Sequence, residues 1–143
     1  MAEREVVEHP GAAAVVAHDG ETLYMVRQPR EAVDELALLE LPAGKLDEEG
    51  ESPLDTAQRE LAEEIGKGAR SWQHLTSFYT SPGFTDEECH VFLATGLSDA
   101  EADTDENERI DIEVRPLSEL DALIDETRDS KTLIGLLELR RRR

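Results

Sequence analysis

The chain has 143 residues, and its 34 acidic side chains outnumber 15 basic ones to give a formal charge of −19. That length suits one domain around one core, so we expect residues 1–143 to form a single domain. The charge argues against non-specific binding to nucleic acid, whose phosphates would be repelled. An evenly acidic surface is also typical of proteins that work in high salt, which makes a halophilic source a hypothesis.

Hydropathy and cysteine usage narrow the setting in which the chain works. Hydrophobic residues make up 38% of the chain, which is enough for a core, and no apolar run reaches membrane-spanning length. The N-terminus shows no charged-then-apolar signal pattern. Cys89 is the single cysteine and cannot form an internal disulfide. These features predict a protein of the reducing cytoplasm.

The first part of the chain is predicted to form strands. Three runs are rich in alanine and β-branched residues, namely residues 5–9, 12–18 and 22–28. Asp19-Gly20 lies between the second and third runs and is a good hairpin signal. Residues 31–36 then read as a polar connection, and residues 37–41 as a short strand that delivers Glu40 and Ala43 to one place.

A helix is predicted to begin at Pro53 and to end before Gly66. Ser52 suits the N-cap, proline suits the first helical position, and glycine favours the C-terminal end. One face of this helix carries the apolar residues Leu54, Ala57, Leu61 and Ile65, which are spaced to contact a core. The helix is therefore well specified by local signals.

Three carboxylates crowd a neighbouring face of the same helix. Glu60, Glu63 and Glu64 stand at positions i, i+3 and i+4, where like charges destabilise a helix by a few tenths of a kcal/mol per pair. A divalent metal ion would reverse that cost, because Mg²⁺ and Ca²⁺ prefer oxygen ligands. In so acidic a chain the alternative is a solvated helix face.

The second half alternates strands, loops and helices. We expect strands over residues 72–80, 89–94 and 109–114, a turn-rich loop over 81–87, and helices over 118–125 and 130–140. Residues 98–107 show no periodicity and contain no large apolar side chain, which predicts a mobile acidic loop.

At this point the chain resembles a known motif, the Nudix box, which reads G-x5-E-x7-R-E-U-x-E-E-x-G-U with U apolar. The matching positions are Gly44, Glu51, Arg59, Glu60, Leu61, Glu63, Glu64 and Gly66. Two positions depart from it: six residues rather than five separate Gly44 from Glu51, and Lys67 stands where an apolar residue is usual. The extra residue falls in a loop, which absorbs it easily.

The resemblance implies an α/β Nudix fold, an α/β/α sandwich with a mixed sheet, and hydrolysis of a pyrophosphate bond. It implies Mg²⁺, with Mn²⁺ as a substitute, bound by Glu60, Glu64 and the Ala43 carbonyl. Glu63 would bind a further ion or orient a water molecule, and Arg59 would brace Glu51. In the acidic loop, Glu106 and Glu108 look like the element in which some members keep a catalytic glutamate.

Other stretches are similar to the ADP-ribose pyrophosphatase branch, including VRQPR, LELPAGKLD, SPGFTDE and DSKTLIGLL. A proline sixteen residues beyond the box glycine looks like that branch's mark, and Pro82 stands there. The resemblance implies hydrolysis of ADP-ribose to AMP and a sugar phosphate by a homodimer. The residues it suggests for substrate binding are Arg27, Arg30, Glu40, Pro82, Gly83 and Phe84.

Several alternatives stay open from the sequence. Arg27 and Arg30 can pair with surface glutamates instead of a phosphate, and either loop glutamate can simply be solvated. The substrate can be another nucleoside diphosphate derivative, such as a dinucleoside polyphosphate. A Nudix-fold sensor that binds ADP-ribose without cleaving it is the third reading, although a binder has no need for all three helix carboxylates.

Overall fold

The computed structural model describes residues 3–103 and 109–143. Its strands are β1 (Ala12–His18), β2 (Thr22–Arg30), β3 (Glu35–Glu40), β4 (Ala43–Lys45), β5 (Lys67–Tyr79), β6 (Glu88–Asp99) and β7 (Asp111–Pro116). Its α-helices are α1 (Pro53–Ile65), α2 (Leu120–Glu126) and α3 (Ser130–Arg141), with short 3₁₀ helices at Glu31–Val33 and Leu117–Glu119. No helix within these described residues is long and apolar enough to cross a membrane.

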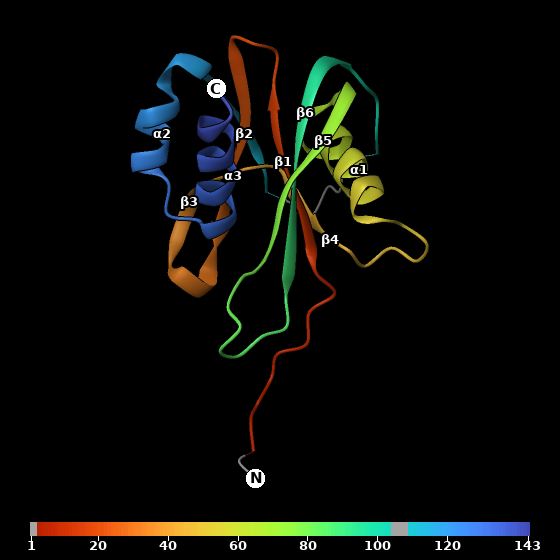
Figure 1. Cartoon of the computed structure of the whole chain (residues 1–143), viewed down its shortest axis with the longest axis vertical. Helices are drawn as coiled ribbons and strands as arrows, with labels where there is room; N and C mark the ends of the chain where they lie inside the picture. The colour runs from red at the N-terminus through yellow and green to blue at the C-terminus, as the bar shows by residue number, and fades with distance from the viewer. Residues whose placement is uncertain (1–2, 104–108) are drawn as a thin grey trace.

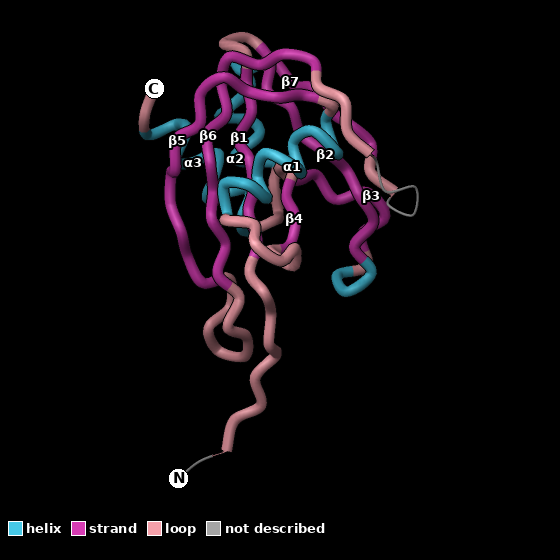
Figure 2. The backbone as a smooth tube through the Cα atoms, turned by 90° about the vertical axis from the view of Figure 1, so that its right-hand side faces the viewer, coloured by secondary structure: helices cyan, strands magenta, loops and turns pink. Residues whose placement is uncertain are grey.

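The strands form one mixed sheet in the order β3-β2-β1-β6-β5. β1 pairs with β6 in parallel, whereas β4 and β7 add antiparallel pairings to β1 and β2. The helix α1 covers one face of the sheet, and α2 and α3 cover the other (Figure 1). Figure 2 shows α1 lying across the strands on the side that faces the viewer. This arrangement confirms the predicted α/β/α sandwich.

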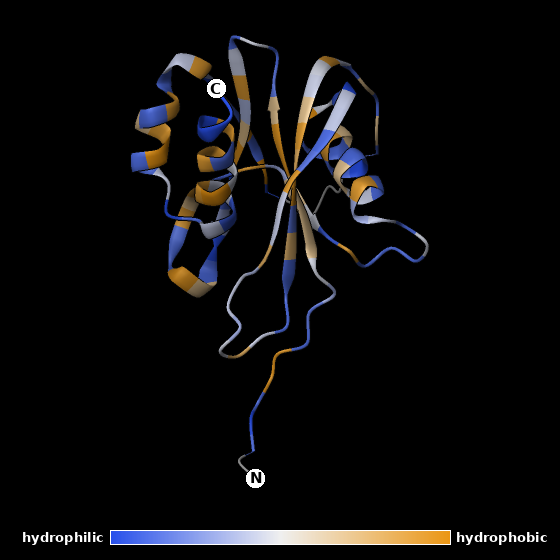
Figure 3. Cartoon of the chain, viewed as in Figure 1, coloured by the Kyte–Doolittle hydropathy of each residue, from blue (hydrophilic) through white to orange (hydrophobic). Residues whose placement is uncertain are grey.

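The hydrophobic core has two layers, one on each face of the sheet. β1 is buried from both sides, so alternate residues such as Ala14 and Val16 face α3, while Val15 and Ala17 face α1. Because a central strand is covered on both faces, residues 12–17 are all apolar and buried. Figure 3 shows the apolar colouring gathered along the central strands and the inner faces of the helices.

The helix α1 begins and ends as its sequence predicts. The Ser52 side chain accepts a hydrogen bond from the Asp55 N–H at 3.1 Å, and the Asp55 carboxylate accepts one from the Ser52 N–H, which completes a capping box. Gly66 ends the helix in the left-handed conformation with φ of 76°. Because Ala57 and Leu61 are buried against the sheet, the helix is fixed in rotation about its own axis.

Three sequence predictions need correction. The segment 5–9 is not a strand of the sheet: Val7 forms an isolated bridge with Thr85, because this segment lies along the loop after β5. β5 begins at Lys67 and β6 continues to Asp99, and these two ends pair with each other. Long-range pairing thus extends both strands beyond their apolar runs. The predicted helix 118–125 is a 3₁₀ turn followed by a shorter α2.

Candidate active site

A cleft of about 350 Å³ opens where β2, β4, α1 and α3 approach one another. Its lining residues are His9, Ala12, Gln28, Arg30, Ala43, Gly44, Lys45, Asp47, Glu60, Glu64, Glu87 and Lys131. The structure therefore brings together Arg30, Ala43, Glu60 and Glu64, which the sequence singled out from segments far apart in the chain. Glu40 is fully buried behind the cleft and pairs with two of its cations.

Gly44 and Glu60 fit directly against each other. A Cβ atom at position 44 would overlap the Glu60 carboxylate, so only glycine leaves room for that side chain. Glu60 is buried as a residue, with 11% of its side chain exposed. The glycine of the turn thus has a packing reason, which is to let α1 present a carboxylate at the backbone of β4.

Glu64 lies one turn further along α1 and is tied to the same backbone. Its Oε2 accepts a hydrogen bond from the Ala43 N–H at 3.0 Å. The neighbouring Pro42 carbonyl accepts a hydrogen bond from the Val15 N–H at 2.9 Å, which attaches this segment to the central strand. Two carboxylates and one stretch of backbone are therefore held together by the packing of α1 on the sheet.

Arg59 lies among the carboxylates and relieves their repulsion. Its Nε donates to Glu51 at 2.9 Å, and its Nη1 donates to Glu60 at 3.1 Å and to Glu63 at 3.2 Å. The hydrogen bonds from Arg59 hold the pKa of Glu51 below its ordinary value, and the same contact with Glu51 raises the pKa of Arg59. The predicted brace between Arg59 and Glu51 is confirmed.

The donors at this site suit a hard divalent cation. Glu60 and Glu64 offer carboxylate oxygens, and the backbone at Ala43 offers a carbonyl. Among the described residues, no three His, Cys, Asp or Glu side chains are grouped so that they could hold a metal ion. A cation bound by two carboxylates and a carbonyl would keep its other positions for water or a phosphate, which is how Mg²⁺ is usually held.

Two cations anchored by carboxylates also line the cleft. Arg30 donates Nε and Nη2 to the two Glu40 oxygens at 2.8 and 2.9 Å. Lys131 donates to Glu40 at 2.6 Å and to Asp129 at 2.8 Å. Burial lowers the pKa of Lys131, but the charges of Asp129 and Glu40 outweigh that effect and raise it above its ordinary value. Both cations are therefore charged at neutral pH.

Lys131 was not among the predicted site residues, although the sequence contains a signal for it. It stands in the first turn of α3, where a cation opposes the positive end of the helix dipole. A lysine at that position needs a compensating anion. Asp129 supplies one locally as the N-cap of α3, whereas Glu40 is distant in sequence.

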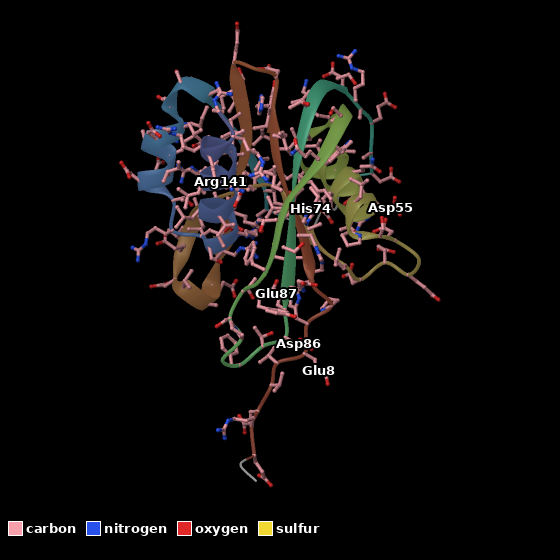
Figure 4. All side chains as sticks on the ribbon, viewed as in Figure 1. Glu8, Asp55, His74, Asp86, Glu87 and Arg141 are labelled. Carbon is pink, nitrogen blue, oxygen red and sulfur yellow. The ribbon has the colours of Figure 1, made fainter. Side chains whose placement is uncertain are left out.

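His9 also lines the cleft and was not predicted to do so. Its Nδ1 accepts a hydrogen bond from the Gly11 N–H at 3.0 Å, and its Nε2 lies 3.5 Å from Glu87. Figure 4 shows Glu87 and Asp86 at the end of the β5–β6 hairpin, near Glu8 of the N-terminal segment. The His9 N–H donates to Asp86 at 2.9 Å, which joins these two segments.

The remaining predicted residues lie elsewhere. Arg27 pairs with Glu113 at 2.7 Å and is not among the residues that line the cleft. Pro82, Gly83 and Phe84 line a separate hollow of about 590 Å³ beside the N-terminal segment. The predicted catalytic residues Glu106 and Glu108 lie outside the described residues.

Comparison with known proteins identifies relatives along nearly the whole chain. Residues 7–136 match the model of the NUDIX domain family. The chain is 46% identical over 138 residues to the methanol dehydrogenase activator of Bacillus methanolicus and 44% identical over 138 residues to the ADP-ribose pyrophosphatase of Bacillus subtilis. Each of these alignments covers 93% of this chain and 74% of the relative.

Two further likenesses differ in extent. The ADP-ribose pyrophosphatase of Mycobacterium tuberculosis is 54% identical over 95 residues, which is 66% of this chain and 45% of the relative. The crystal structure of an ADP compounds hydrolase superposes with a TM-score of 0.82 at 24% identity, covering 94% of this chain and 71% of that one. The latter likeness supports the fold.

The contact between Gly44 and Glu60 generates a prediction. Gly44→Ala should displace the Glu60 carboxylate and weaken the binding of Mn²⁺, measured by electron paramagnetic resonance, by about tenfold or more, as expected when the support of a ligand is lost. Gly68→Ala is the matched control, because a Cβ there makes an ordinary van der Waals contact with Ala100 at 3.6 Å. Equal Mn²⁺ affinity in both variants would remove Glu60 from the metal site.

Proposed function

We propose that this chain, which belongs to the NUDIX domain family, hydrolyses the pyrophosphate bond of ADP-ribose or a related nucleoside diphosphate sugar. The products would be AMP and a sugar phosphate. One observation carries the proposal: two α1 carboxylates, a backbone turn and two anchored cations line a single cleft. The substrate class is supported by the relatives from Bacillus subtilis and Mycobacterium tuberculosis, both of which are ADP-ribose pyrophosphatases.

The family generally uses a divalent metal, and for this chain we propose Mg²⁺, with Mn²⁺ as a substitute. Glu60, Glu64 and the Ala43 carbonyl would hold it. When bound, the ion would neutralise charge on the pyrophosphate and favour attack by water. The hydrogen bond from the Ala43 N–H keeps Glu64 at the turn, and the Gly44 contact keeps Glu60 there.

The protein's own residues would divide the remaining work. Arg30 would bind a phosphate, because its guanidinium is planar and Glu40 fixes it in orientation. Glu63 would bind a further ion or orient a water molecule, and Arg59 holds it near the other carboxylates. The cleft thereby offers an anionic substrate N–H donors in fixed directions inside a chain of charge −19.

A general base is also needed, and we propose Glu106 or Glu108 for this role on the basis of the family resemblance. We assign the other predicted substrate contacts, Arg27, Pro82, Gly83 and Phe84, on the same basis. Within one chain Arg27 pairs with Glu113, so its assignment rests on the resemblance alone. The single, buried Cys89 accords with a reducing compartment, and we place the reaction in the cytoplasm.

The main prediction is a product analysis. With Mg²⁺ the purified protein should convert ADP-ribose to AMP and ribose 5-phosphate, resolved by chromatography, and should do so faster than it cleaves dinucleoside polyphosphates.

Glu64→Gln should lower turnover by about 10²-fold or more while the protein stays folded, because a charged ligand is lost. The exposed Glu101→Gln serves as the control.

The outcomes of that assay separate the alternatives. Binding of ADP-ribose with no product in the presence of Mg²⁺ would favour a non-catalytic sensor. Faster cleavage of a dinucleoside polyphosphate would assign another substrate class. Near-normal turnover of Glu64→Gln would remove that residue from the metal site.

The base is tested by replacing Glu106 and Glu108 with glutamine, one at a time. General base catalysis contributes about 10²- to 10⁴-fold, so loss of the base should lower kcat within that range and leave KM nearly unchanged. Glu101→Gln again controls for loss of a carboxylate in the same acidic region. If both variants keep the normal rate, the residue that activates water lies on α1.

The loop after β5 leads to a prediction about specificity and assembly. Val6, Tyr79 and Phe84 are more than half exposed and line one hollow, and exposed apolar clusters often mark interfaces. We therefore propose a homodimer, which light scattering on the purified protein should detect.

Pro82→Ala should change the relative rates on a panel of nucleotide sugars more than it changes the melting temperature. A parallel fall on every substrate would contradict a role in specificity, and a monomeric mass would contradict the dimer.

A further inference from the structure

Lys131 occupies a costly position that its neighbours stabilise. It lies in the first turn of α3, whose positive end disfavours a cation, and its side chain is only 16% exposed. Two carboxylates compensate, Glu40 at 2.6 Å and Asp129 at 2.8 Å. A buried ammonium held this firmly would serve the fold poorly by itself, because buried ion pairs seldom stabilise more than apolar residues of similar volume.

The contacts of Lys131 with the described residues leave one of its N–H donors for a ligand. An ammonium has three N–H donors, and the bonds to Glu40 and Asp129 use two of them. Lys131 also lines the cleft that contains Glu60 and Glu64. We therefore infer that the third N–H is available to an acceptor bound in that cleft.

The surrounding contacts fix where the ammonium lies. Glu40 is fully buried and bridges Lys131 to Arg30, accepting from both. Asp129 also accepts from the Thr132 hydroxyl at 2.6 Å, and that hydroxyl oxygen in turn accepts from the Leu41 N–H at 2.9 Å. The start of α3 is thereby joined to the end of β3. Arg30 and Lys131 are thus held together by Glu40 in the cleft that the α1 carboxylates also line.

We propose that Lys131 is a substrate-binding residue that contacts a phosphoryl oxygen of the bound diphosphate, with Glu40 and Asp129 as its positioning residues. The inference rests on the proposed function and adds to it a second cation beside Arg30. An ammonium is a compact charge that binds phosphate without the two-point geometry that guanidinium needs. The two cations can therefore bind different oxygens of the same diphosphate.

The test compares Lys131→Met with Lys131→Arg and with a matched control, Lys67→Met. Lys67 also contacts a carboxylate, Asp99 at 2.6 Å, but does not line the cleft. With Mg²⁺ and ADP-ribose, Lys131→Met should raise KM by about 10- to 100-fold, the value of one hydrogen bond to a charged group, and change kcat by less than about threefold. Lys131→Arg should recover most of the affinity, and Lys67→Met should match the unaltered protein.

A second measurement separates this inference from the proposed substrate. Calorimetry with inorganic pyrophosphate and Mg²⁺ should rank the unaltered protein and its variants in the same order of affinity, because pyrophosphate carries the phosphates without the nucleoside. If ADP-ribose is not cleaved but pyrophosphate binding still depends on Lys131, the substrate assignment fails and the phosphate contact stands. Equal pyrophosphate affinity in Lys131→Met and Lys67→Met overturns the contact.

If Lys131→Met fails to fold, a second variant tests the same phosphate contact. Asp129→Asn retains a good N-cap for α3 and keeps the ammonium, but it removes the charge that anchors it. Its affinity for pyrophosphate should fall by about threefold or more, in line with the loss of one charged hydrogen bond partner. Unchanged affinity in this variant would also overturn the proposal.

Discussion

The contact of α1 with the backbone of β4 is the constraint on which the site depends. The apolar stripe of α1, with Ala57 and Leu61 at its centre, fixes the rotation of the helix on the sheet. That rotation leaves Glu60 against Gly44 and Glu64 beside the Ala43 N–H. Hydrophobic packing, which has no directional preference of its own, thus places two charged groups at a defined piece of backbone.

The cations in this acidic chain are held by neighbouring carboxylates and act over short distances. The overall charge of −19 would repel an anionic substrate, yet the cleft holds cations that carboxylates keep in place. Glu40 accepts from Arg30 and Lys131 together, and Glu51 accepts from Arg59. Once Asp129 beside Lys131 is counted, each such group is nearly neutral at a distance, so it does not offset the acidic surface. At hydrogen-bonding range it still presents N–H donors in fixed directions.

Local signals predicted much of the fold, and long-range pairing explains the rest. The capping box at Ser52 and the left-handed Gly66 are short-range features, so the limits of α1 could be read from the sequence. The pairing of Lys67 with Asp99 joins residues on different strands, and neither apolar run extends that far. The strand prediction for the segment around Val7 fails for a similar reason, because its partner Thr85 lies in a loop rather than in the sheet.

The site shows the same division between local and long-range information. Arg27 and Arg30 were both predicted to bind substrate, but the fold directs Arg27 to Glu113 on β7 and Arg30 to the cleft. The register of β2 decides between them, including its irregularity between Gln28 and Arg30. Lys131 meets Glu40 only through tertiary structure, since 91 residues separate them. A lysine in the first turn of a helix was nevertheless visible from sequence. Because the helix dipole disfavours a lysine there, such a residue implies compensating anions, which are the adjacent N-cap Asp129 and the buried Glu40.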